Sequence, residues 1–428
     1  MSDKKRIIHF LRQSSGNLLE WYDYALYGVF AVQISQTFFS ASDSQFIALL
    51  LTFATFAIGF ISRPLGSLLF GYLGDKYGKG FSVNLTIWCM ALPTLCLGLL
   101  PGYSEIGLLA PLLLVVIRIV QGMSAGGQLS GLISIAADSE STNKPFLVSF
   151  IWSISIAGGL IATFVGFVSM SVVGHYLQTY NVQNDYLLEL TWRIPFMMSF
   201  LLFLLYMVVS PKNSTKKTDE PVAEYKVVDI FKQQPRELVL LVLLNACIQT
   251  IGYVLFTYLV TYMQINWSFN AKNSLLWVNC VLVLSVILYP FFGYIVPKFG
   301  CRLRQAQIFG LILLPAIIMF GLYHTSPMLG IIGLVIMIVL NCGVAGFVGS
   351  LFGELFHTKY RMTACSLSYN IGVIFAGFSP MLAETFNKLS SFGLSSFLLI
   401  LTAILVVVLG RLRTLSSYKN LEPARNNI

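Results

Sequence analysis

Apolar residues fill most of this chain in long stretches, and short polar segments separate one stretch from the next. A helix needs about 20 predominantly apolar residues to cross the hydrocarbon core of a bilayer. Twelve stretches are long enough, so we predict an all-α membrane protein with twelve transmembrane helices. With approximate ends, they cover residues 18–39, 46–73, 81–100, 108–137, 146–173, 192–210, 237–265, 274–296, 305–323, 328–353, 363–386 and 392–411.

The positive charges lie mainly on one side of these stretches. Most of the 27 lysines and arginines fall in the two terminal segments and in the loops that follow every second stretch. Because cytoplasmic loops carry the excess of Lys and Arg, both termini are predicted to be cytoplasmic, which requires an even number of spans. A polar, charged loop at 211–236 divides the chain. We therefore predict a cytoplasmic central loop between two pseudo-symmetric six-helix halves, at 1–210 and 237–411, followed by a cytoplasmic tail at 412–428.

The composition excludes several kinds of partner. Of the 428 residues, 56% are hydrophobic and 11% are charged, whereas a soluble domain carries about 25% charged residues. The net charge of +9 is dispersed over the ends of the spans, so it reflects membrane topology and predicts no nucleic-acid partner. The seven cysteines have no CxxC spacing and the four histidines form no cluster, so neither a metal nor a cofactor is predicted.

Neither an enzyme nor an ATP-driven pump is indicated. The chain has no HExxH or GxSxG motif, and the glycines and lysines at 74–80 have the wrong spacing for a phosphate-binding loop. A membrane-embedded receptor or enzyme is an alternative to a carrier. Uptake by vesicles separates them, because a receptor or enzyme would accumulate no solute when a proton gradient is imposed.

Two carboxylates stand near the start of the first span. At helical spacing Glu20 and Asp23 share one face with Tyr24 and Tyr27. A charged side chain at membrane depth is expensive unless it meets a partner or water. That face is therefore expected to point into the protein interior or an aqueous path, as in a carrier, and Glu20 and Asp23 become candidates for binding a proton.

The fourth span carries an arginine at about the middle of the membrane. Arg118 lies about ten residues in from the external end, roughly 15 Å deep at 1.5 Å per residue. A guanidinium there is always charged and needs an anion, carbonyl groups or water. We predict that Arg118 binds a substrate carboxylate, that Gln121 orients the substrate, and that Tyr24 and Tyr27 line the wall. Gly122 and Gly126 form a small-xxx-small pair, which permits close helix contact.

A second arginine, Arg63, falls in the cytoplasmic part of the second span. The first span runs outward and the second inward, so Arg63 has a depth similar to that of Glu20 and Asp23. We predict a cluster of Arg63 with Glu20 and Asp23 at the inner end of the path. The alternative is a purely structural ion network.

In the eleventh span Tyr369 and Asn370 are polar groups within an apolar stretch. They are candidates for lining the substrate path, and a hydrogen bond between helices explains them equally well.

The two halves share an internal repeat. The segment at 71–80, after the second span, matches the segment at 293–302, after the eighth, in its Gly, Tyr, Lys, aromatic and Gly positions. Parallel six-helix repeats around a central path are a plan of transporters. The first copy resembles the signature loop of the major facilitator superfamily. That resemblance implies a cytoplasmic gate containing Asp75 and Lys79; an ordinary solvated turn is the alternative.

Further segments resemble the metabolite:proton symporter family of that superfamily, whose members carry proline and betaine, α-ketoglutarate, citrate or shikimate. The matching pieces are Gly16-Asn17 with Glu20-Trp21-Tyr22-Asp23, Arg63-Pro64-Leu65-Gly66, Gly71 to Lys79, Arg118 with Gln121-Gly122 and Gly126-Gly127, Thr191-Trp192-Arg193-Ile194-Pro195-Phe196, and Ser368-Tyr369-Asn370. One position departs from the family pattern: Gln128 stands where a glutamate is usual, and an amide cannot carry a proton.

The resemblance implies a secondary carrier of the bacterial inner membrane, working by alternating access. Its partners would be protons and a small carboxylate-bearing or zwitterionic solute, with Glu20 or Asp23 as the coupling group. An exporter or a uniporter of the same fold without proton coupling is the alternative. The particular solute and the oligomeric state stay open.

Overall fold

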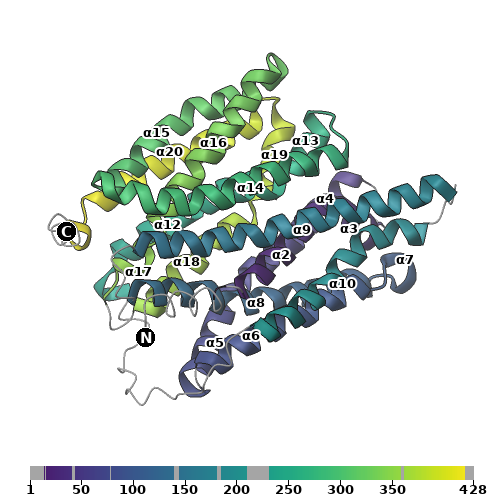
Figure 1. Cartoon of the computed structure of the whole chain (residues 1–428), viewed down its shortest axis with the longest axis horizontal. Coiled ribbons are helices and arrows are strands. Elements are labelled where there is room, and N and C mark those ends of the chain that lie inside the picture. Colours follow the sequence, from purple (N-terminus) through teal and green to yellow (C-terminus); the bar gives the residue numbers. More distant parts are fainter. Residues whose placement is uncertain are drawn as a thin grey trace. The chain divides into compact units, whose positions relative to one another are not determined.

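The computed structural model describes residues 14, 16–40, 44–77, 79–138, 144–180, 185–209, 231–357 and 361–419. All regular structure in these residues is helical (Figure 1). The helices are α2 (Gly16–Val29), α3 (Ala31–Phe38), α4 (Gln45–Ile61), α5 (Arg63–Tyr77), α6 (Lys79–Leu99), α7 (Tyr103–Ile106), α8 (Leu109–Asp138), α9 (Lys144–Tyr180), α10 (Asp185–Val209), α12 (Pro235–Tyr253), α13 (Leu259–Asn266), α14 (Ala271–Ile295), α15 (Arg302–Gly321), α16 (Pro327–Val348), α17 (Leu351–Glu354), α18 (Arg361–Gly377), α19 (Ser379–Leu389), α20 (Gly393–Arg413) and α21 (Ser416–Lys419).

Every predicted span falls on helix, but not every one of these helices is long and apolar enough by itself to cross a membrane. Among the described residues, 10 helical stretches are long and apolar enough to cross a membrane, and Leu85–Leu99 is a shorter apolar helix. The first predicted span corresponds to α2 and α3, which break at Phe30 and carry Glu20 and Asp23. The chain is therefore an all-helical, multi-pass membrane protein. The total of twelve spans and the cytoplasmic termini stay predictions.

The seventh predicted span is not a uniform α-helix. A π-helical turn at Val254–Tyr258 separates α12 from α13. Such a turn inserts an extra residue into the helical ladder and is common at functional sites. Gly28 of α2 lies against it, because a Cβ at Gly28 would stand 2.3 Å from Cγ2 of Thr257. The hydropathy pattern contains no sign of this turn.

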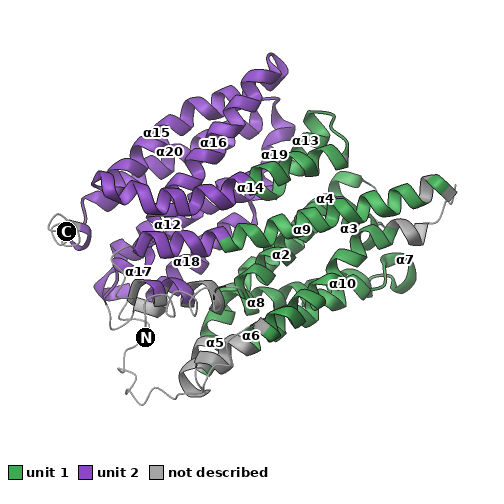
Figure 2. Ribbon diagram, in the orientation of Figure 1, with its two compact units in different colours: residues 1–129, 154–220, 256–283 green, residues 130–153, 221–255, 284–428 purple. Residues whose placement is uncertain are grey.

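The chain divides into two compact units (Figure 2). Unit 1 comprises Met1–Leu129, Ile154–Glu220 and Phe256–Val283, and unit 2 comprises Ser130–Ser153, Pro221–Leu255 and Leu284–Ile428. These compact units are a different division from the two six-helix halves expected from the sequence. Those halves, with boundaries at 210 and 237, stay a prediction.

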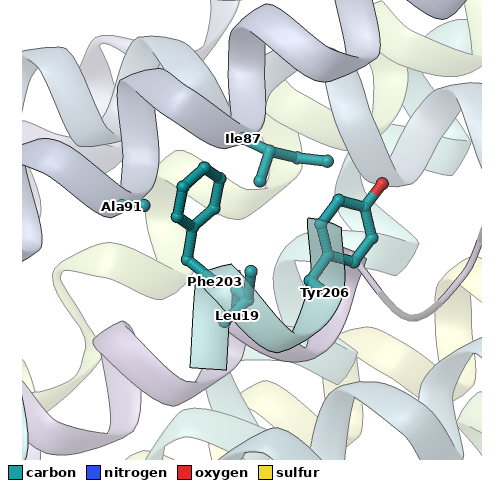
Figure 3. Packing of buried hydrophobic residues seen from close by; sticks show 5 residues of the cluster. All are labelled: Leu19, Ile87, Ala91, Phe203 and Tyr206. Carbon is teal, nitrogen blue, oxygen red and sulfur yellow. The ribbon is translucent and has the colours of Figure 1, made fainter. Parts of the chain in front are cut away.

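Within unit 1, α2 packs against α6 and α10 through a small apolar cluster (Figure 3). The cluster consists of Leu19, Ile87, Ala91, Phe203 and Tyr206. A hydrogen bond of 2.8 Å from the Tyr22 hydroxyl to the Pro195 carbonyl adds a polar tie between α2 and α10. These contacts fix the rotation of α2, and hence the direction in which its carboxylates point.

Glycines bring α8 close to α4 and α5. A Cβ at Gly122 would stand 1.7 Å from the carbonyl oxygen of Gly59, and one at Gly126 would stand 2.0 Å from that of Arg63. No side chain fits at such separations, so the predicted close contact at this small-residue pair is confirmed. This close approach places α8, which carries Arg118, beside α5, which begins at Arg63.

In unit 2, a buried ion pair ties the start of α15 to the end of α17. Nη2 of Arg302 lies 2.6 Å from Oε2 of Glu354, and Nη1 donates to the Ser350 hydroxyl at 2.5 Å. The final helix α21 docks nearby, where the Ser417 hydroxyl donates to Oε1 of Glu237 at 2.9 Å. Burial raises the pKa of the neighbouring Tyr418 phenol.

Candidate functional site

The candidate site lies in unit 1 and contains two buried ion pairs, both made by α2. Nη2 of Arg63 lies 2.9 Å from Oε1 of Glu20, and Nη1 of Arg118 lies 2.9 Å from Oδ2 of Asp23. All four side chains are at most 1% exposed. The predicted contact of Arg63 with Glu20 is therefore present.

Asp23, however, pairs with Arg118 and not with Arg63, so a single cluster around Arg63 was the wrong arrangement. The physical reason is helical rotation. Residues three apart differ by about 300° at 3.6 residues per turn, so their directions diverge by about 60°. Glu20 consequently faces α5, whereas Asp23 faces α8.

Asp23 accepts three hydrogen bonds. Arg118 donates to Oδ2, while Nε2 of Gln121 at 2.9 Å and the hydroxyl of Thr94 at 3.0 Å both donate to Oδ1. Nε2 of Gln121 also lies 2.8 Å from the Thr94 hydroxyl. In this structure Gln121, expected to orient a substrate, orients Asp23.

Arg118 keeps part of its donor capacity. Its Nη1 binds Asp23, whereas Nε and Nη2 have no hydrogen-bond partner among the described residues. These two nitrogens form one edge of the planar guanidinium, the geometry that matches both oxygens of a carboxylate. The ring of Tyr27 covers the guanidinium at 3.7 Å from its centroid. The site thus holds a buried, permanently charged group with a free two-point edge.

Glu20 is held more loosely than Asp23. Its Oε1 accepts from Arg63, and its Oε2 has no partner among the described residues. Arg63 itself lies over two rings, 4.8 Å from the centroid of Tyr24 and 4.6 Å from that of Phe60. Aromatic faces stabilise a cation by about 2 kcal/mol when both are desolvated.

The two predicted wall residues both contact arginines. Tyr24 is 2% exposed and faces Arg63, and Tyr27 is 0% exposed and faces Arg118. The Tyr27 hydroxyl hydrogen-bonds the Thr55 hydroxyl and donates to the Thr52 carbonyl at 3.2 Å. These tyrosines therefore support the positive charges of the site.

The formal charges of the site balance. Two carboxylates and two guanidiniums sum to zero, and every member is buried. Removing one partner of a buried pair leaves an uncompensated charge, which destabilises by about 3–5 kcal/mol. The site therefore disfavours any single added charge and tolerates the addition of opposite charges together.

Tyr369 lies in a separate polar cluster within unit 2. Nε2 of Gln249 donates to its hydroxyl at 2.9 Å, and Nδ2 of Asn245 donates to its carbonyl at 2.7 Å. The rings of Trp152 and Phe352 lie 6.0 Å and 6.2 Å away. A hydrogen bond between helices, one of the two explanations considered for Tyr369, is therefore present between α12 and α18.

Asn370 bonds within its own helix. Its Nδ2 donates to the carbonyl of Ser366 at 2.9 Å. The side chains of Asp75, Lys79 and Gln128 lie outside the described part of the structure. The same part contains no group of three His, Cys, Asp or Glu side chains able to hold a metal ion.

Sequence reasoning missed Thr94. A threonine inside an apolar span is unremarkable, because its hydroxyl can bond the carbonyl four residues earlier, as Thr94 does with Met90 at 2.8 Å. The same hydroxyl proton also lies within reach of Asp23, and this contact depends on how α6 packs against α2, which no spacing in the sequence encodes.

Comparison with known proteins agrees with this architecture. The family model described as "Major Facilitator Superfamily" matches residues 14–364. A proline/betaine transporter of Salmonella typhimurium is 30% identical over 397 residues, covering 86% of this chain and 75% of the relative. A putative proline/betaine transporter of Staphylococcus aureus is 31% identical over 391 residues, covering 86% and 79%.

Solved structures show the same fold at lower identity. A partially occluded, inward-open xylose transporter of E. coli superposes with a TM-score of 0.73 and 18% identity, over 96% of this chain and 97% of the other. The transporter FucP in its outward conformation superposes with a TM-score of 0.65 and 14% identity, over 95% of this chain and 99% of the other.

Proposed function

The chain belongs to the major facilitator superfamily and is a secondary transporter, not an enzyme, and from this premise we propose proton-coupled uptake of a small carboxylate-bearing or zwitterionic metabolite. The observation that carries the proposal is the buried Arg118, with one nitrogen on Asp23 and a free edge of two nitrogens.

The substrate carboxylate binds this free edge. A two-point hydrogen bond to a guanidinium fits a carboxylate in shape as well as charge. Gln121, beside Arg118, presents Oε1 as an acceptor, because that atom has no partner among the described residues. The relatives named proline/betaine transporters support a zwitterion as the solute, since proline and betaine each carry a carboxylate.

Proton coupling follows from the balance of charge in the site. The carboxylate end of the solute, arriving alone, gives the buried group a net charge of minus one, and a proton arriving alone gives plus one. For a zwitterion this requires that its positive end lies outside the buried group. When both arrive the sum returns to zero, so each ligand favours binding of the other, and the linkage is reciprocal. Glu20 and Asp23 are the two candidates for the proton.

The remaining features of the carrier are part of the same proposal. Twelve spans in two six-helix halves, at 1–210 and 237–411, rock about the site with both termini in the cytoplasm. Asp75 and Lys79 act in the cytoplasmic gate, and Tyr369 and Asn370 line the path. The membrane is the bacterial inner membrane.

One observation favours an exporter or uniporter without proton coupling. Gln128 stands where the resembling symporters have a glutamate, and an amide cannot exchange a proton. Proton-gradient dependence of uptake separates the two candidates.

The experiment is uptake into proteoliposomes of labelled proline, glycine betaine, 2-oxoglutarate, citrate and shikimate under an inward proton gradient, with and without a protonophore. We expect protonophore-sensitive accumulation of one solute, its loss in Arg118→Ala, and its retention in Cys301→Ala. Uptake that only equilibrates, whatever the gradient, would support the uniporter instead. Proton-gradient-driven loss of solute preloaded into the vesicles would support the exporter.

A further inference from the structure

We propose that Glu20 carries the coupled proton, while Asp23 stays ionised as the fixed counter-ion of Arg118. This inference rests on the proposed proton-coupled transport. It assigns different roles to two carboxylates that are equivalent in the sequence pattern.

The surroundings of Asp23 favour its ionised form. Both of its oxygens are engaged as acceptors, by Arg118 on one side and by Gln121 and Thr94 on the other. Three of its about four acceptor sites are therefore occupied, and the site that remains is on Oδ2, the oxygen bound to the Arg118 guanidinium. The guanidinium has no acceptor atom, and the Gln121 amide would have to rotate to present its Oε1 before it could accept a hydrogen bond from a protonated Asp23.

The surroundings of Glu20 allow protonation. Its Oε1 accepts from Arg63, and Oε2, buried and without a partner among the described residues, can take a proton without breaking that bond. When Glu20 becomes neutral, Arg63 keeps the faces of Tyr24 and Phe60. This arginine therefore has support that does not depend on the charge of Glu20.

The charged neighbours of Glu20 are few in the described residues. Arg63 of α5 faces it, and Asp23 and Tyr24 follow on its own helix. Arg118 of α8 faces Asp23, on the same helix as Glu20. The remaining elements packed on α2 contribute uncharged groups. These are Phe60 of α4, Ile87 and Ala91 of α6, Ser155 and Gly158 of α9, and Pro195, Phe203 and Tyr206 of α10.

The proton step balances simply. An O–H bond forms at Oε2 of Glu20 with a proton from the external solution, and the same bond breaks when the proton leaves to the cytoplasm. No electron is transferred. Between these events the substrate carboxylate on Arg118 offsets the charge that Glu20 has lost.

The test compares Glu20→Gln with Asp23→Asn in the full chain, in proteoliposomes, with the solute panel above. Glu105→Gln, which removes an exposed carboxylate from α7, is the control for loss of a negative charge. Glu20→Gln is expected to retain exchange of labelled for unlabelled substrate, while its accumulation ratio under a proton gradient falls to about one. Asp23→Asn removes the counter-ion of Arg118 and is expected to change KM, but Glu20 can still bind the proton, so substrate should still accumulate in response to the gradient.

The outcomes separate the two levels of the proposal. If wild-type vesicles accumulate no member of the panel, the proposed function fails and this inference fails with it. If wild type accumulates a solute and Glu20→Gln does so equally, or if only Asp23→Asn loses the response, this inference alone is overturned.

A measurement on the unmutated protein guards against variants that do not fold. Infrared difference spectra are recorded on substrate binding with ¹³C-carboxyl glutamate or ¹³C-carboxyl aspartate incorporated. A protonated-carboxyl band that appears on binding and shifts only with labelled glutamate supports Glu20. A shift with labelled aspartate, or no such band, contradicts it.

Discussion

Arg118→Lys is the perturbation that separates the shape of the Arg118 edge from its charge. Lysine keeps a positive partner for Asp23, but its ammonium lacks the planar pair of nitrogens. In the structure one nitrogen of Arg118 serves Asp23, and two are free to bind a substrate carboxylate. The variant is therefore expected to fold and to bind substrate through one hydrogen bond where the wild type makes two.

The magnitude follows from the loss of that bond. A hydrogen bond to a charged group contributes about 1.5–3 kcal/mol, and each 1.4 kcal/mol changes an equilibrium about tenfold. KM for a carboxylate substrate should rise by about 10- to 100-fold, with a small change in thermal stability. Arg118→Ala differs, because it leaves Asp23 buried and uncompensated and should destabilise the protein by about 3–5 kcal/mol.

The assay measures KM and kcat in proteoliposomes, together with Tm of the purified protein. The double variant Arg118→Ala with Asp23→Ala is the matched control, because removing both charges should recover Tm relative to Arg118→Ala without restoring transport. A KM in Arg118→Lys within about twofold of wild type, less than 1 kcal/mol, would refute two-point binding of the substrate carboxylate.

Three further pairs of variants test the packing and the support of the site. Gly122→Ala places a methyl group 1.7 Å from a carbonyl oxygen of α4 and should markedly lower Tm, whereas Gly174→Ala, which meets nothing within 4 Å, should leave Tm unchanged or raise it. Thr94→Val removes a hydrogen bond to the ionised Asp23 carboxylate, worth about 1.5–3 kcal/mol, so it should raise KM by up to about 100-fold, and Thr94→Ser should restore it; an unchanged KM would mean that the bond to Asp23 is not needed. Tyr27→Phe retains the ring over Arg118 and should transport normally, whereas Tyr27→Leu loses a cation–π contact of about 2 kcal/mol and should lower Tm or raise KM.

The sequence pattern was sufficient to predict where helices form and which charged side chains are buried within them. Arg118, Arg63 and the carboxylates stand out because charges inside apolar stretches are rare and need partners. The small-residue pair of α8 was likewise visible, because small residues four apart are a contact signal that depends on spacing alone.

The pairing of Glu20 with Arg63 was predicted, but the partner of Asp23 was not, because it depends on rotation about the helix axes. A turn of about 60° decides whether Asp23 meets Arg63 or Arg118, and that turn is set by the packing of Leu19 and Tyr22 against α6 and α10. The role of Thr94 and the π-helical turn at Val254–Tyr258 were missed for the same reason. Both arise from tertiary contacts that leave the hydropathy pattern unchanged.

The most direct test of coupling through charge balance is the number of protons taken up when substrate binds. The purified protein is mixed with a transported carboxylate substrate in weakly buffered solution containing a pH indicator. We expect uptake of about one proton for each substrate bound, declining at low pH as the acceptor is already protonated. Saturating substrate binding with no proton uptake at any pH would contradict the account.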